Sequence, residues 1–283
     1  MKNTLKIIGK LLLIGLITTL IRIIGQLLIP AGSQTVLEPS AFVENGTMPI
    51  AFSIYGLFAY SVIASLFLLV KAQISGTRIM RGLKYAVSCC LIWDIYLLEP
   101  LPHVAFVDKF TYPLADSCAL LVMGLLAGLL LCEKGVHGHK RKLELQWIPT
   151  LAISGCFFVG RIVQYCAIGI YSSFEQNTVG SVIWSILTGL IVSFVLQWLN
   201  QKIISSNRIV KIVLIGTVLF GVDLFLFNFF MPLVFNADIA DLILRTFIDI
   251  GSITIGCFSL LGTHNTEKQL LNSVLPRCAS DNQ

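Results

Sequence analysis

Charged side chains are scarce in this sequence. Of its 283 residues only 12% are Asp, Glu, Lys or Arg, whereas 56% are hydrophobic and the mean hydropathy is +0.85. Soluble domains carry about 25% charged residues, so the composition excludes an ordinary water-soluble fold. A helix that crosses a bilayer needs about 20 mostly apolar residues. The chain is therefore expected to span a membrane several times, with the lipid bilayer as its first partner.

Motifs of the common enzyme classes are missing as well. The chain has no phosphate-binding glycine loop, no nucleophile elbow and no HExxH motif. Its eight cysteines form no CxxC pair and no zinc spacing, so we interpret them as packing thiols. No histidine pair lies within the apolar runs, which argues against haem ligation. We predict no metal, no cofactor and no catalytic residue, and we favour a non-enzymatic protein.

Eight apolar stretches divide the chain and predict an all-α polytopic bundle of about eight transmembrane helices. The first stretch resembles a signal peptide, but it is too long and lacks a clean cleavage site, so we interpret it as a span. The predicted spans cover approximately residues 11–29, 49–70, 85–99, 112–132, 147–171, 180–199, 212–231 and 239–261.

The hydrophilic segments between these spans differ in basic charge. Taken alternately, one set of segments, which includes both termini, carries sixteen of the 20 Lys and Arg residues, and the other set carries only Lys109. The remaining three are Arg22, Arg161 and Arg245, inside spans. Cytoplasmic loops attract Lys and Arg, so we expect both termini in the cytoplasm and an even number of spans. The net charge of +5 thus reflects topology, and we expect a bacterial plasma-membrane protein with no nucleic-acid partner.

Charged residues recur along the chain in a way that predicts an internal duplication. Asp94 lies in an apolar run that ends at Pro100, and Asp223 lies in a run with Pro232 near its end. We predict two tandem four-helix repeats of the same orientation, residues 1–142 and 143–283; the alternative is eight unrelated helices. At separations of 129 to 139 residues, the matched charges are Arg22 with Arg161, Asp94 with Asp223, and Asp116 with Asp249.

Charges inside the predicted spans gather in the outer half of the membrane. A charge at the bilayer centre is costly and needs a partner or water. Two interpretations stay open: a cavity that binds a substrate or relays protons, and Arg–Asp pairs that only clamp the helices together. The candidate site or charge network consists of Arg22, Gln26, Asp94, Glu99, Asp116, Arg161, Gln164, Asp223, Asp241, Arg245 and Asp249.

The membrane carboxylates outnumber the arginines. We expect Arg22 and Arg161 each to bond to a carboxylate, with Asp94, Asp223 or Asp249 as the acceptor. The remaining carboxylates must be protonated, hydrated or occupied by a cation, and a desolvated carboxylate can carry a proton. The sequence therefore favours a small secondary transporter, proton-coupled, for an unidentified small molecule or ion.

Two other functions stay open. One is a membrane sensor or accessory subunit whose basic loops contact a cytoplasmic protein or anionic lipid. The other is an enzyme that acts on a lipid, although no nucleophile is visible. An intramembrane aspartyl protease is disfavoured because neither Asp94 nor Asp223 follows a Gly-x-Gly sequence. Two weaker signals are a GxxxG motif from Gly124 to Gly128, which predicts close helix packing, and His103, which we place alone at the outer surface.

Overall fold

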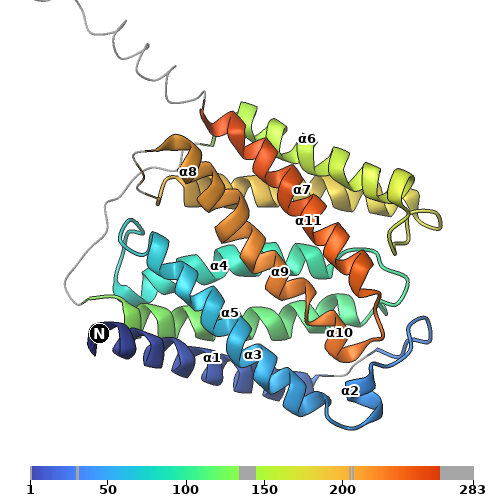
Figure 1. Ribbon diagram of the computed structural model, residues 1–283, viewed down its shortest axis with the longest axis horizontal. Coiled ribbons are helices and arrows are strands. Elements are labelled where there is room, and N and C mark those ends of the chain that lie inside the picture. Colours follow the sequence, from blue (N-terminus) through green and yellow to red (C-terminus); the bar gives the residue numbers. More distant parts are fainter. Residues whose placement is uncertain (1, 30–31, 134–144, 204, 206, 262–283) are drawn as a thin grey trace, which may run out of the picture.

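The computed structural model describes residues 2–29, 32–133, 145–203, 205 and 207–261, and these residues form an all-helical bundle. Figure 1 shows the long helices crossing the molecule from one end to the other. Seven of them are long and apolar enough to cross a membrane. Large hydrophobic side chains such as Ile54, Leu151 and Phe247 lie exposed on the bundle's surface, as contact with lipid requires. The chain is thus built as an integral membrane protein.

The long helices follow the predicted spans closely. In the first half the helices are α1 (Lys2–Leu28), α2 (Ala41–Glu44), α3 (Met48–Val70), α4 (Arg78–Leu97) and α5 (Asp108–Leu131). In the second half they are α6 (Trp147–Val163), the π-helix η1 (Gln164–Ile168), α7 (Thr178–Asn200), α8 (Arg208–Val213), the π-helix η2 (Leu214–Gly221), α9 (Val222–Asn228), α10 (Met231–Val234), α11 (Ile239–Cys257) and the 3-10 helix η3 (Phe258–Leu261). The segments α8, η2 and α9 follow one another without a break.

The start of α4 differs from the prediction. We expected Arg78 and Arg81 in a loop before a span over residues 85–99, but the helix already begins at Arg78. Thr77 caps it by accepting a hydrogen bond from the Met80 amide. Arg81 is buried and donates to the carbonyl of Lys71, so its charge finds a partner within the bundle. With four charged residues, α4 is not among the seven apolar helices.

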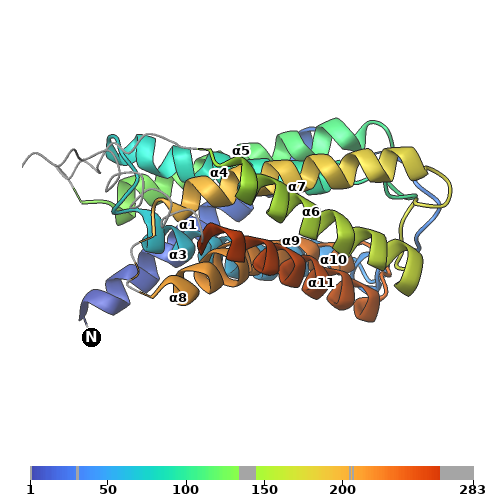
Figure 2. The ribbon, with the colours of Figure 1, turned by 90° about the horizontal axis from the view of Figure 1, so that it is seen from above.

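The strongest helix contacts follow the same order in the two halves, whereas the weaker ones differ: α3 also contacts α5, and α7 also contacts η2. In the first half α1 packs against both α3 and α5, and α5 packs against α4. In the second half α6 packs against both α7 and α11, and α11 packs against η2 and α9. Figures 1 and 2 show these groups side by side, and α4 joins them through contacts with α7 and α9.

Glycines set the close approach of α4 and α5. A Cβ atom on Gly82 would lie 1.9 Å from the carbonyl oxygen of Gly124, and one on Gly128 would lie 2.3 Å from the carbonyl oxygen of Arg78. No larger residue fits at these positions without separating the helices. The GxxxG motif therefore packs internally, as expected.

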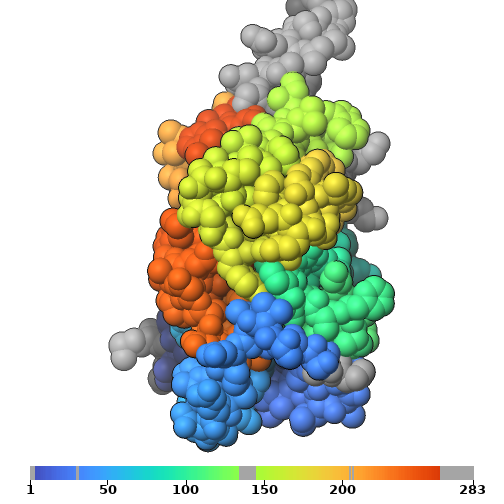
Figure 3. Space-filling model, turned by 90° about the vertical axis from the view of Figure 1, so that its right-hand side faces the viewer, coloured from blue at the N-terminus to red at the C-terminus, as the bar shows by residue number. Residues whose placement is uncertain are grey.

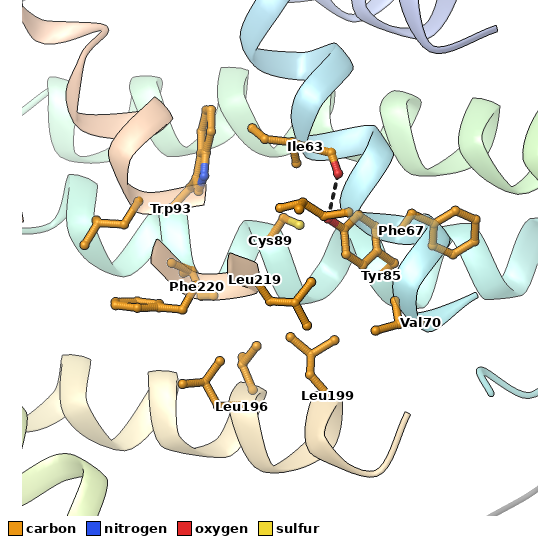
Figure 4. Close-up of a cluster of buried hydrophobic side chains, with 14 of the residues drawn as sticks. Ile63, Phe67, Val70, Tyr85, Cys89, Trp93, Leu196, Leu199, Leu219 and Phe220 are labelled. Atoms are coloured by element: carbon orange, nitrogen blue, oxygen red, sulfur yellow. Dashed lines mark hydrogen bonds between the residues drawn. The ribbon is translucent and has the colours of Figure 1, made fainter. Parts of the chain in front are cut away.

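A hydrophobic core joins the halves near the end of the molecule that holds Lys71 and Lys202. Figure 4 shows Phe67 and Tyr85 from the first half facing Leu199 and Leu219 from the second. The Tyr85 hydroxyl donates to the carbonyl of Ile63 over 2.8 Å, which removes the cost of burying it. The seven described cysteines are free thiols; Cys278 lies outside the described residues.

We call the opposite end of the bundle the acidic end, because its connecting segments carry Glu38, Glu44, Glu175 and Asp238. A segment over residues 32–47 crosses this end, where Figure 3 shows it in blue. The Gly32 amide donates to Asp108 at the start of α5 over 2.7 Å. On the other side, the Ser40 hydroxyl donates to the carbonyl of Leu233 over 2.7 Å, and Pro39 forms a β-bridge with Phe235. The segment therefore ties the two halves together.

Candidate functional site

A cavity of about 620 Å³ lies between the two halves, near the acidic end. Its walls come from α1, α3, α4 and α5 on one side and from α9, α10 and α11 on the other. Most of the lining is aromatic or aliphatic, with charged groups in a few places. The aromatic and charged lining residues are Phe52, Tyr60, Trp93, Tyr96, Tyr112, Phe227, Phe230 and Phe235, together with Arg22, Glu99, His103, Asp108, Asp116 and Arg245.

Glu99, Arg161, Arg245 and Asp249 form a continuous set of ion pairs, which we call the four-charge network. Oε1 of Glu99 accepts from Nη1 of Arg161 over 2.9 Å and from Nη2 of Arg245 over 2.7 Å. Arg161 also donates through Nη2 to Oδ2 of Asp249 over 2.6 Å. The side chains of Arg161 and Asp249 are each only 1% exposed, so both charges depend on these partners.

Aromatic rings and an irregular turn complete the surroundings of Arg161. Its guanidinium lies 4.6 Å from the ring centroid of Trp184 and 5.4 Å from that of Phe157, distances at which a cation is attracted to the ring face. The π-helix η1 begins directly after α6 and places Gln164 where its amide donates to Oδ1 of Asp249 over 2.8 Å. Gly169, with φ of 74°, ends this turn.

Arg22 and Asp116 form a separate ion pair between α1 and α5. Nε of Arg22 donates to Oδ1 of Asp116, and Nη1 donates to Gln26, one turn further along α1, over 2.9 Å. All three residues line the cavity or its rim together with Phe52, whose ring centroid lies 6.0 Å from the guanidinium. The cavity thus has two charge clusters, the Arg22–Asp116 pair within the first half and the four-charge network, in which Glu99 of the first half meets residues of the second.

Asp94 and Asp223 are not among the cavity-lining residues, and they contact no arginine among the described residues. Asp94 accepts from the Ser117 hydroxyl over 2.7 Å through Oδ2, and its Oδ1 has no hydrogen-bond partner in the described chain. Asp223 accepts from the indole nitrogen of Trp93 over 3.1 Å. Trp93 also lines the cavity, so its indole ring links Asp223 to the cavity lining.

The remaining polar groups lie where α11 meets the loops of the acidic end. Asp241 is half-buried and accepts from the Tyr171 amide over 3.2 Å, so it does not join the ion pairs of Arg245 and Asp249. His103 is buried against Tyr171, with 3.0 Å between its Nδ1 and the Tyr171 hydroxyl. Burial and the nearby Arg245 lower the pKa of His103 to about 4, which keeps it neutral at pH 7.

Comparison with protein-family models, curated proteins and solved structures gave no match. The functional argument therefore depends on the geometry of the cavity and its charges.

The structure brings together most of the residues that the sequence singled out, with one partner that differs. Arg161 bonds to Asp249, as expected, but Arg22 bonds to Asp116, not to Asp94, Asp223 or Asp249. The reason is geometric: Asp116 on α5 faces α1, which packs directly against α5.

Sequence reasoning missed two features of this site. Glu99 was predicted to belong to the charge network, but the sequence did not reveal that it accepts hydrogen bonds from both Arg161 and Arg245. His103 was placed alone at the surface, but it is buried and lines the cavity. Pro100 and Pro102, which directly precede this histidine, were the available signal, because they turn the chain back over the bundle after α4 ends at Leu97.

The chemistry available here is binding and proton transfer. The lining offers ring faces for an apolar body, guanidinium donors and carboxylate acceptors. The described residues include no group of three or more histidine, cysteine or acidic side chains arranged to hold a metal ion. Two carboxylates without arginine partners among the described residues, Asp94 and Asp223, are suited to take up and release protons, and Asp223 is linked to the cavity lining through Trp93.

Proposed function

We propose that this protein is a small secondary transporter, and that its substrate site is the cavity between the halves. The observation that carries this proposal is the position of the cavity: helices of both halves line it, and so do ion-paired groups from both, Arg22, Glu99 and Asp116 from the first half and Arg245 from the second. Transporters built from two halves bind substrate at the interface between them, which is the association that supports the proposal. Asp94 and Asp223 supply the proton coupling.

The proposed topology has eight spans, with both termini in the cytoplasm. It takes α4 as the eighth span, because α4 lies alongside α5 and runs between the same two ends of the bundle (Figure 1). The split of basic residues between alternate loops then places the acidic end outside. Several basic residues of the proposed cytoplasmic side lie in 134–144 and 262–283, outside the described residues. We place the protein in the plasma membrane. Reporters fused at Arg78 and Arg208 are expected to lie on its cytoplasmic side.

An internal duplication is part of the proposal. In each half an arginine on the first long helix bonds to an aspartate on the fourth: Arg22 to Asp116, and Arg161 to Asp249. The shared order of helix contacts supports the same idea. The proposed boundary near residue 142 lies outside the described residues. An experimental structure in which the four long helices of one half do not superpose on those of the other would refute the duplication.

Purified protein in proteoliposomes tests the transport proposal directly. With a pH-sensitive dye inside the vesicles, adding a substrate from a metabolite panel should move protons in the wild type and not in empty vesicles. The matched controls are Asp94→Asn and Asp223→Asn, which keep shape and hydrogen bonding but lose the titratable group. If no compound moves protons or charge, the accessory role, with a protein partner at the basic loops, takes the place of transport.

A further inference from the structure

We infer that the cavity takes a lipophilic organic cation, such as a quaternary ammonium with an aromatic or branched apolar body. This inference rests on the proposed function, because it names the substrate class of the same cavity. Three observations lead to it: the ring faces on the walls, the excess of carboxylates over arginines, and the carboxylate oxygens left without a partner.

Aromatic rings form a continuous wall on the cavity. Phe230 lies at its centre, with ring centroids 5.1 Å from Phe52, 5.9 Å from Tyr60 and 6.0 Å from Trp93. The face of an aromatic ring carries negative charge density, and a desolvated cation gains most from it. Aromatic rings also pack against neutral apolar ligands. The ionised groups of the cavity must therefore add to the selection for a positive charge.

The ionised groups of the lining and those outside it favour a positive ligand. The lining has three carboxylates, Glu99, Asp108 and Asp116, against two guanidinium groups, Arg22 and Arg245. Outside the lining, Arg161 and Asp249 neutralise each other, whereas Asp94 and Asp223 have no arginine partner among the described residues. The field in the cavity is therefore negative when these carboxylates are ionised.

Two lining carboxylates also have an oxygen free to receive a ligand. Glu99 accepts both of its hydrogen bonds through Oε1, and Asp116 accepts from Arg22 through Oδ1. Within the described chain, no donor bonds to Oε2 of Glu99 or to Oδ2 of Asp116. An anion would have to displace these carboxylates from their arginines, whereas a cation adds to the oxygens that remain free.

Three probes of similar shape and different charge test the inference on the wild-type protein in nanodiscs. They are benzyltrimethylammonium, its neutral carbon isostere neopentylbenzene, and phenylmethanesulfonate, with protein-free nanodiscs as the reference for lipid partitioning. Titration calorimetry should show that the cation binds about tenfold more tightly than the neutral probe, and that the anion binds least. Equal affinity for cation and isostere, or tighter binding of the anion, would overturn the inference.

A pair of variants then locates the binding. Phe230→Leu removes a ring face but keeps an apolar side chain. It should therefore weaken the binding of the cation at least threefold and leave the affinity for the neutral probe unchanged. Phe110→Leu is the matched control, because Phe110 is exposed and lies outside the cavity lining. Equal losses for both probes, or a loss in the control, would contradict the assignment.

The two proposals fail in different ways. If a neutral or anionic compound drives proton flux in proteoliposomes and competes at the cavity, the transport proposal holds and the cation inference is wrong. If none of the three probes binds and no compound drives flux, both the transport proposal and the cation inference are wrong.

Discussion

The two charge clusters of the molecule differ in how their arginines are held. Arg161 has two carboxylate partners and aromatic rings around it, and it is almost fully buried. Arg22 has one carboxylate, the amide of Gln26 and a face towards the cavity. The same kind of pair between a first and a fourth helix is thus enclosed by protein in one half and lines the cavity in the other.

This difference suggests separate roles for the clusters. A buried charge that loses its partner is left in a medium that cannot solvate it, whereas a charge at a cavity can take up water. The four-charge network is therefore expected to hold the fold, with Glu99 joining the halves. The pair of Arg22 and Asp116 is expected to contribute less to stability and more to the cavity's ligand.

Removing Arg161 should have the largest effect. Arg161→Ala strands Asp249 and removes a partner from Glu99, so it should lower the free energy of unfolding in detergent by about 3–5 kcal/mol. The double variant Arg161→Met with Asp249→Leu leaves Glu99 bonded to Arg245 and should recover most of the loss. A single variant as stable as the wild type would show that the network does not hold the fold.

Removing Arg22 should cost less. Arg22→Ala leaves Asp116 beside the cavity, where water can solvate it, so we expect a loss of about 1–3 kcal/mol in the same unfolding measurement. The matched double variant is Arg22→Met with Asp116→Leu, which should fold well and bind the cation probe weakly. If Arg22→Ala destabilises the protein more than Arg161→Ala does, the comparison between the clusters is reversed.

The carboxylates without arginines should matter for function more than for stability. Asp94→Asn and Asp223→Asn keep an acceptor for Ser117 and for Trp93, so unfolding free energies should change by less than about 1 kcal/mol. At least one of them should abolish proton flux or flatten its pH profile. Unchanged flux and an unchanged pH profile in both would remove these aspartates from the mechanism.

The smallest effect expected comes from His103 and depends on pH. Because its pKa is lowered to about 4, the folded state favours the neutral ring, and His103 contributes stability above the pKa of an unfolded histidine. That contribution should be lost as the pH falls from about 6.5 towards 4. The charged groups facing His103 are Arg245, Glu99 and Asp108. His103→Gln should reduce the slope of stability over this range, and an unchanged slope would contradict the assignment.

The sequence determined the helices better than their contacts. Apolar run length located nearly every long helix, and the in-span charges Arg161 and Asp249 did meet. The rotation of each helix about its own axis decides which neighbouring side chain a charged residue contacts. The local sequence pattern does not predict that rotation. The π-helix that brings Gln164 to Asp249 is also hidden, because its residues read as an ordinary apolar run.

The central claim is that the cavity between the halves is the working site. Leu97 lines this cavity, whereas its neighbour Leu98 is exposed and does not. Substrate-driven proton flux should therefore be lost in Leu97→Trp, which fills the cavity, and retained in Leu98→Trp, with both variants folded and monodisperse. Equal flux in the two variants would contradict the claim.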